Sequence, residues 1–245
     1  ETYGVTKLWL LGMRTFQLVQ WNGLFRCSEA AVHMTWSWWT NGDDFMMTPG
    51  NDVLKYQPEE LPAPFQHRLN LSLCCHQALR VWKWLLTYAG FPTGPNDPVF
   101  PAIARTERAA KSDAWSGPVR DFYGEAVAEA DKLGLEVGSA EHQYWLEGPI
   151  REQRGRWADG LKELHLSAGF TARHAGERIS SHGNRRGPAT QMHKNGGTVP
   201  EIAAALRHQD FTVTHRYIQL EPDEVLNTSD INLDQKAHPT NGASA

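Results

Sequence analysis

The 245-residue sequence predicts a mainly helical α+β protein with a small antiparallel β-sheet. Hydrophobic residues make up 40% of the chain, and ten Trp and nine Phe supply bulky side chains for a substantial core. Most segments place apolar residues at helical spacing, whereas patterns typical of strands occur at only two places. The length accommodates one large globular domain or two small ones.

The first half of the chain is predicted to contain three helices and the sheet. Asn22-Gly23 ends the first helix, and Ser28 is placed to cap the second. A loose, Pro-rich connection that holds Lys55 joins the two strands. In order, these elements are helices at 5–22 and 28–34, strands at 45–48 and 67–72, and a helix at 74–89.

The second half gives clear signals only near its end. Residues 90–101 are rich in Pro and Gly and are predicted to form a loop before a helix at 117–133. Scattered glycines and a charged run predict an insertion or surface subdomain over 134–181. Three helices then follow, the second of them opened by a capping box. They span 181–195, 198–206 and a last segment, capped by Asp210 or Thr212, that carries Tyr217.

The charge of the chain is unevenly distributed. A net charge of −4, taken alone, argues against a nucleic-acid partner. Between Arg173 and Arg216, however, seven basic residues and three acids give a local charge of +4. Residues 40–64 and 217–245 each hold five acids and one lysine. Because salt screens charges beyond about 8–10 Å, the basic segment can bind an anionic partner although the whole chain is acidic.

Several classes of protein are excluded. No stretch of about 18 apolar residues occurs, so we expect no transmembrane helix and no membrane partner. The first residues lack the layout of a signal peptide, and we expect a location in the cytoplasm or nucleoid of a prokaryote or the nucleus of a eukaryote. Cys74-Cys75-His76 lacks the further ligands that a zinc site requires. We therefore expect neither a metal nor a cofactor.

The most informative residues form a C-terminal constellation. His182 and Arg185 lie one helical turn apart, so their side chains point the same way. His208 follows 23 positions after Arg185, and Tyr217 follows nine positions later. A phenol has a pKa of about 10 in water and is a poor nucleophile, but fixed positive charge and hydrogen-bond donors can activate it. Attack on phosphorus would then leave a covalent phosphotyrosine.

Motifs around these residues point to one family. The C-terminal segment reads His182-x-x-Arg185, Gly187-Pro-Ala-Thr190, Asn195-Gly196, Glu201-Ile202, Leu206-Arg-His208, Thr214 and Tyr217. Upstream, the chain reads Gly23-Leu-Phe-Arg26-Cys-Ser-Glu29. Together these motifs resemble the boxes of the tyrosine recombinase, or phage integrase, family over roughly 5–90 and 170–222. The resemblance implies the catalytic-domain fold of that family across residues 1–222, with an unmatched insertion at about 91–170.

The resemblance also implies a function and a set of roles. The chain would be a site-specific DNA recombinase or integrase that cuts and rejoins DNA through a 3′-phosphotyrosyl intermediate. Arg26 and Arg185 would clamp the phosphoryl oxygens of the transition state. The other roles are His182 as proton acceptor or phosphate ligand, His208 as donor to a phosphate oxygen, Lys55 as general acid and Tyr217 as nucleophile.

Partners follow from the same resemblance. We expect double-stranded DNA as substrate, a homo-tetramer on that DNA, and chemistry that needs neither metal nor ATP. We also expect an upstream core-binding domain that this chain lacks, and a polar tail at 223–245. Contacts with the DNA are expected from four basic side chains, Arg186, Lys194, Arg207 and Arg216.

Other interpretations stay open. The chain could be a DNA-binding protein of the same fold with weak or no activity, because the connection around Lys55 is long and acidic. A metal-dependent hydrolase is less consistent with the sequence because the spacing of metal ligands is missing. A type IB topoisomerase shares the chemistry, but the spacing of the motifs is more similar to that of integrases. Taken alone, Arg26 could simply pair with Glu29. The nearby tryptophans are expected to form core contacts rather than a base-stacking platform, namely Trp36, Trp38 and Trp39.

Overall fold

The computed structural model describes residues 5–38, 45–47, 63–65, 70, 73–105, 107–111, 117–169, 182–208 and 210–218. Within these ranges the chain is mainly helical with two small antiparallel sheets, which confirms the α+β class. Among the helices described there, none combines the length and the apolar character that a bilayer-spanning segment needs.

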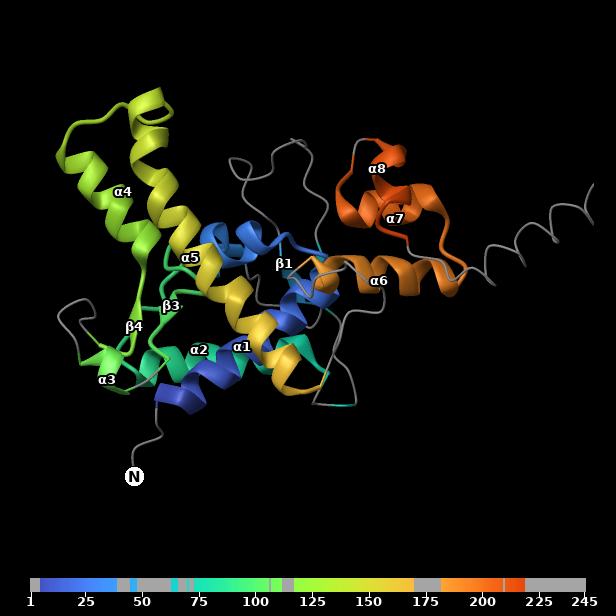
Figure 1. Ribbon diagram of the computed structural model, residues 1–245, viewed down its shortest axis with the longest axis horizontal. Coiled ribbons are helices and arrows are strands. Elements are labelled where there is room, and N and C mark those ends of the chain that lie inside the picture. The colour runs from blue at the N-terminus through green and yellow to red at the C-terminus, as the bar shows by residue number, and fades with distance from the viewer. Residues whose placement is uncertain are drawn as a thin grey trace, which may run out of the picture.

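Figure 1 shows how the elements are arranged in space. In chain order they are α1 (Val5–Gly23), η1 (Glu29–His33), η2 (Trp36–Trp38), β1 (Phe45–Met47), β2 (Ala63–Phe65), α2 (Cys75–Tyr88), β3 (Ala102–Ile103), α3 (Glu107–Ala110), β4 (Val119–Arg120), α4 (Phe122–Lys132), α5 (Ala140–Ser167), α6 (Gly183–Lys194), α7 (Val199–Leu206) and α8 (Phe211–His215). The helices α1, α2 and α5 form the body, α4 extends from it with the first half of α5, and α6 to α8 lie beside the other end.

The main core lies between α1, α2 and α5. Phe16 on α1 contacts a cluster in which Trp82 and Trp157 are almost fully buried. Each indole N–H donates to a backbone carbonyl, that of Trp82 to Val99 at 2.7 Å and that of Trp157 to Phe100 at 3.0 Å. Both tryptophans therefore contribute their large apolar area to the core without leaving a polar atom unpaired.

Two glycines allow the helices of the core to approach closely. A Cβ at Gly160 on α5 would lie 2.7 Å from the sulfur of Met13 on α1. A Cβ at Gly12 would lie 3.0 Å from Trp82 and 3.2 Å from Trp157. Side chains at these positions would displace the neighbouring atoms, so the absence of a Cβ is what lets α5 cross α1 here.

Several predicted elements are confirmed. α1 covers the helix predicted at 5–22, α2 matches the helix at 74–89 with Cys74 as its N-cap, and β1 lies within the first predicted strand. The helix predicted from Ser28 forms as the short π-helical turn η1. Trp36 and Trp38 are buried in the core as expected, whereas Trp39 lies outside the described residues.

The sheets differ from the prediction. β1 pairs with β2, a segment that was not predicted as a strand, and Met46 lies opposite Pro64. Proline lacks the N–H that a ladder uses, so a Pro-containing segment gives a weak strand signal in the sequence. Most of 67–72 lies outside the described residues. A second sheet pairs Ile103 with Val119, a residue predicted in a helix, and α4 begins only at Phe122.

The largest difference is α5, a continuous helix of 28 residues where an insertion or surface subdomain was expected. Internal glycines and Pro149 weaken its local helix propensity and interrupt its apolar period. Its second half nevertheless belongs to the main core through Trp157 and Leu161. Burial against α1 thus stabilises a helix that the local sequence does not indicate.

The C-terminal helices form a smaller cluster beside the end of α1. α7 opens with the predicted capping box between Thr198 and Glu201 and ends at Arg207, whose φ of 55° is left-handed. The buried apolar contact between Leu24, just after α1, and the helices α6 and α7 includes Ala189, Ile202 and Leu206. This contact fixes α6 and α7 against the segment that follows α1.

Candidate functional site

The candidate site lies where the end of α1 and η1 meet α6, α7 and α8 (Figure 1). Leu24 follows α1 with a positive φ of 53°, a conformation that is costly for a residue with a Cβ. The carbonyls of Gly23 and Leu24 both accept hydrogen bonds from guanidinium groups on the C-terminal helices. The hydrogen bond between Leu24 and Arg185 joins residues that are 161 positions apart in the sequence.

Glu29 is the acidic centre of the site and is only 3% exposed. Arg26 Nη1 lies 2.5 Å from its Oε1, while Arg185 Nη1 and Arg207 Nη2 lie 3.7 and 3.5 Å from its Oε2. Burial alone would raise the pKa of Glu29, but the surrounding guanidinium groups outweigh that effect and lower it. Three cations around one carboxylate leave an excess of two positive charges. Such an excess attracts an anionic ligand.

Arg185 is 1% exposed and is the most buried of the predicted catalytic side chains that the structure describes. Its Nη1 donates to the carbonyl of Leu24 at 2.5 Å, and its Nη2 donates to the carbonyl of Leu206. Burial lowers the pKa of Arg185 to about 10 while Glu29 opposes the shift, so the guanidinium stays charged at neutral pH. Its Nε is buried without a hydrogen-bond partner.

Arg207 is buried, although the sequence places it among the DNA contacts. Its guanidinium lies 4.6 Å from the centre of the Phe25 ring and donates to the carbonyls of Gly23 and Leu24, each at 3.2 Å. The left-handed backbone at this position costs about 1–2 kcal/mol for a residue other than glycine. These contacts offset that cost and give Arg207 a positioning role, since they hold the end of α1 beside Glu29.

His208 is held from both sides of its ring. Nε2 lies 3.4 Å from Arg185 Nη2, and Nδ1 lies 3.1 Å from Thr214 Oγ1. Because a guanidinium can only donate, Nε2 is the acceptor and Nδ1 carries the proton that Thr214 accepts. Burial and the neighbouring arginines lower the pKa of His208 to about 4, so the ring is neutral at pH 7. To donate from Nε2 to a phosphate, the ring must give up its contact with Arg185 and carry a proton on Nε2, either by changing tautomer or by gaining a proton.

Tyr217 lies beside these groups, just after α8. Its ring centre is 4.9 Å from that of His208 and 5.7 Å from Arg185 Cζ. Thr190 Oγ1 donates to the backbone carbonyl of Tyr217 at 3.2 Å. The backbone N–H of Tyr217 donates to the backbone carbonyl of Thr214 at 2.9 Å. The main chain thus fixes the phenol ring against a cation and an imidazole.

The remaining predicted residues lie at the edge of the site or outside the described residues. His182 is exposed just before α6, and partial burial of its ring together with the nearby arginines lowers its pKa. Arg186 Nη2 donates to the carbonyl of Arg216 at 3.3 Å, and the side chains of Arg216 and Lys194 are exposed. Lys55 lies outside the described residues, so its predicted role as general acid stays a prediction.

Acidification should destabilise the protein through His208. Because the folded state lowers the pKa of His208 from 6.5 to about 4, the unfolded chain binds the proton first as the pH falls through this window. The free energy of unfolding should therefore fall by roughly 1–3 kcal/mol between pH 7 and pH 4. Urea denaturation at several pH values measures this loss. His208→Asn, which keeps a donor near the Nδ1 position, should show a smaller loss, and an unchanged pH dependence would contradict the assignment.

Two parts of the site were not evident from the sequence. Glu29 could be identified only as a possible partner of Arg26, a pair that the structure contains. Its contacts with Arg185 and Arg207 join distant segments, and no local pattern indicates such a contact. The hydrogen bond from His208 to Thr214 also depends on tertiary structure, although Thr214 belongs to the quoted motif.

The structure brings together four side chains from the predicted set, Arg26, Arg185, His208 and Tyr217. Across the described ranges, no three His, Cys, Asp or Glu side chains lie close enough together to hold a metal ion. In comparisons with known proteins, no family model matches the chain, and no curated protein matches it either.

Proposed function

We propose that the chain is a DNA strand transferase of the tyrosine recombinase type, with that family's catalytic-domain fold. The observation that carries the proposal is the position of Tyr217, whose ring lies beside both Arg185 and His208. The site also holds an excess of two positive charges around Glu29, which favours binding of a phosphodiester anion. The motifs that resemble the recombinase boxes support the same reaction.

In the proposed reaction, the phenolic oxygen of Tyr217 attacks the phosphorus of a DNA phosphodiester. The bond from phosphorus to the 5′-oxygen breaks, which leaves a 3′-phosphotyrosine and a 5′-hydroxyl. His182 is the candidate acceptor of the phenolic proton, and Lys55 is the candidate donor to the 5′-oxygen. Arg26 and Arg185 would stabilise the negative charge of the phosphoryl oxygens. Attack by a second 5′-hydroxyl reverses these steps and reseals the strand without ATP.

A second candidate function is DNA binding without cleavage. One observation favours it, because both terminal nitrogens of Arg185 donate to backbone carbonyls rather than pointing freely into the site. A guanidinium held in this way and only 1% exposed can clamp a phosphate only if some of these carbonyl bonds are exchanged. In this case the positive excess would bind the DNA backbone and Tyr217 would remain unmodified.

Covalent capture of DNA tests the proposal. The whole chain is incubated with a pool of nicked duplexes of random sequence, in which the short fragment released by cleavage diffuses away and the adduct accumulates. We expect a covalent protein–DNA band on a denaturing gel for the wild-type chain. Tyr217→Phe should give no band, because the variant keeps the ring contacts but lacks the nucleophilic oxygen. Mass spectrometry of the adduct identifies the linked residue.

The matched control is Tyr88→Phe, which removes an exposed phenolic hydroxyl at the end of α2, an element outside the site. This variant should form the adduct as the wild-type chain does. An adduct mapped to a residue other than Tyr217 would overturn the proposed nucleophile. Retention of DNA by the wild-type chain with no covalent band would instead support the second candidate.

A further inference from the structure

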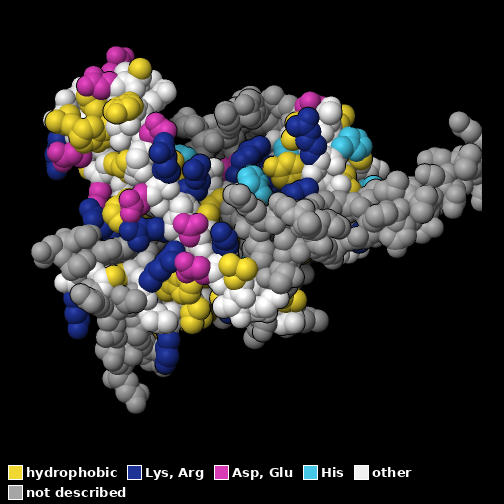
Figure 2. Space-filling view, viewed as in Figure 1, with side chains coloured by type: hydrophobic (Ala, Val, Ile, Leu, Met, Phe, Trp, Pro, Cys, Tyr) yellow, Lys and Arg dark blue, Asp and Glu magenta, His cyan; other side chains and the backbone are white. Residues whose placement is uncertain are grey.

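The tip of the α4–α5 hairpin, residues 129–147, exposes apolar side chains within an acidic surface. Tyr144 is 80% exposed and Val137 is 77% exposed, with Leu133 and Trp145 also exposed nearby. Five acids and one lysine occur in the same residues, an excess of four negative charges. Figure 2 shows hydrophobic and acidic side chains together at the upper left, where Figure 1 places this hairpin. Several large apolar side chains exposed on one short segment indicate an interaction surface.

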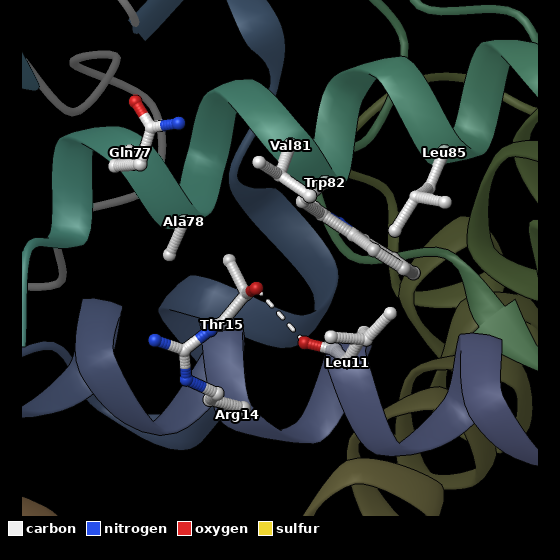
Figure 3. A pocket seen from close by; sticks show the side chains of 8 residues that line it. All are labelled: Leu11, Arg14, Thr15, Gln77, Ala78, Val81, Trp82 and Leu85. Atoms are coloured by element: carbon white, nitrogen blue, oxygen red, sulfur yellow. Dashed lines mark hydrogen bonds between the residues drawn. The ribbon is translucent and has the colours of Figure 1, made fainter. Parts of the chain in front are cut away.

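The α1–α2 groove has the opposite charge. Arg14 and Val81 line it, as Figure 3 shows, and it widens beside Arg80 and Trp84 into a shallow hollow of about 360 Å³. Trp84 is 63% exposed and its ring stacks on that of Tyr88 at 5.7 Å. The sequences of α1 and α2 contain four basic residues and no acid. The groove therefore combines exposed aromatic surface with positive charge.

The tip is held away from the groove of its own chain. Gln153 of α5 donates to the carbonyl of Ala31 at 2.9 Å in the buried interior, and Trp157 fixes the following turn in the core. A helix rises about 1.5 Å per residue, so Ala140 at the start of α5 lies about 20 Å from Gln153 along a continuous helix. Figure 1 shows the tip at the top of the view and α2 at the bottom.

We propose that the tip of one copy of this chain docks in the α1–α2 groove of a second copy. The tip carries an excess of four negative charges, and two arginines, Arg14 and Arg80, line the groove. Exposed aromatic side chains on both surfaces can cover one another, as aromatic residues do at the centres of protein interfaces. The inference goes beyond the proposed reaction and does not depend on it.

Two different surfaces take part, so the contact is heterologous. In an open assembly the copy at one end has an unused tip and the copy at the other end has an unused groove. Copies joined in this way form a ring if the rotation between them closes, and otherwise an open chain. The hairpin would then act as the arm that links one copy to the next.

Sedimentation velocity of the whole chain without DNA tests the contact. We expect the wild-type chain to form species larger than a dimer as its concentration rises. Tyr144→Ser on the tip and Trp84→Ser in the groove should each weaken association at least about tenfold, because each removes an aromatic side chain from the centre of the contact. A mixture of the two variants should form a dimer and nothing larger, since it contains one intact tip and one intact groove per pair.

Leu166→Ser is the matched control, because Leu166 is an exposed apolar residue of α5 outside both surfaces. It should associate as the wild-type chain does, and circular dichroism should show that all three variants are folded. A wild-type chain that stays monomeric would overturn the proposal. So would association that persists in Trp84→Ser but not in Tyr144→Ser, which would indicate contact between two tips or with another partner. A mixture that fails to form the dimer would show that tip and groove do not meet.

Discussion

Glu29→Gln should lower the free energy of unfolding by about 3–5 kcal/mol, because the substitution leaves buried guanidinium groups without their counter-charge. Arg185 and Arg207 are both almost fully buried, and Glu29 is the carboxylate that both of them approach. Glutamine preserves the shape of the side chain but removes the negative charge, so the change isolates the electrostatic contribution. Urea denaturation monitored by tryptophan fluorescence measures the loss.

A matched control for this experiment is Glu201→Gln. Glu29 accepts from the backbone N–H of Arg26, and Glu201 likewise accepts from that of Thr198, each at 2.7 Å, but Glu201 lies on the exposed first turn of α7. Its substitution should cause a much smaller loss. Adding Arg207→Met to Glu29→Gln removes one of the uncompensated cations, so the double variant should lose less than the sum of the two single losses. Equal losses for Glu29→Gln and Glu201→Gln would show that Glu29 does not balance the arginines.

Arg185→Lys should damage both stability and the proposed reaction, although it keeps the positive charge. One ammonium group cannot reproduce the two hydrogen bonds that the guanidinium makes to Leu24 and Leu206. We expect a loss of about 2–4 kcal/mol in the free energy of unfolding, since at least one of these two buried hydrogen bonds is lost. Covalent adduct formation per folded molecule should fall by roughly 10²-fold or more, because a preorganised donor to the phosphoryl oxygens is also lost.

The neighbouring residue provides the control for Arg185. Arg186 carries the same side chain on the same helix, but it is only half-buried and makes one hydrogen bond of 3.3 Å to Arg216. Arg186→Lys should therefore leave the unfolding free energy and the adduct rate close to those of the wild-type chain. If Arg185→Lys forms the adduct at the wild-type rate once folding is accounted for, Arg185 has a structural role only.

The sequence predicts the fold best where an element carries its own local signals. α2 has a stripe of apolar residues, and α7 has a complete capping box, so both could be placed closely. α5 gives no such signal, because Gly148, Gly155 and Pro149 interrupt its pattern. Its helix is stabilised by contacts of Trp157 with residues far away in the sequence, which local analysis does not capture.

The same distinction applies to the site. Tyr217, His208 and Arg185 could be proposed because their spacing resembles a known motif, and the structure places them side by side. The role of Arg207 could not be inferred, since a basic residue in a basic segment is expected to face solvent. Only the folded chain shows that its guanidinium is buried against Phe25 and the end of α1.

The positive charge of the site belongs to the tertiary structure rather than to any one segment of the chain. In the N-terminal part, Arg26 and Glu29 form a pair whose charges cancel. The two further cations, Arg185 and Arg207, come from a part of the sequence more than 150 positions later. The hydrogen bond between Arg185 and Leu24, for example, joins residues 161 positions apart. A chain that ended before α6 would therefore keep the carboxylate and its first partner but would have no net attraction for an anion. The excess of positive charge on which the proposed phosphate site depends exists only once these two parts of the sequence have come together.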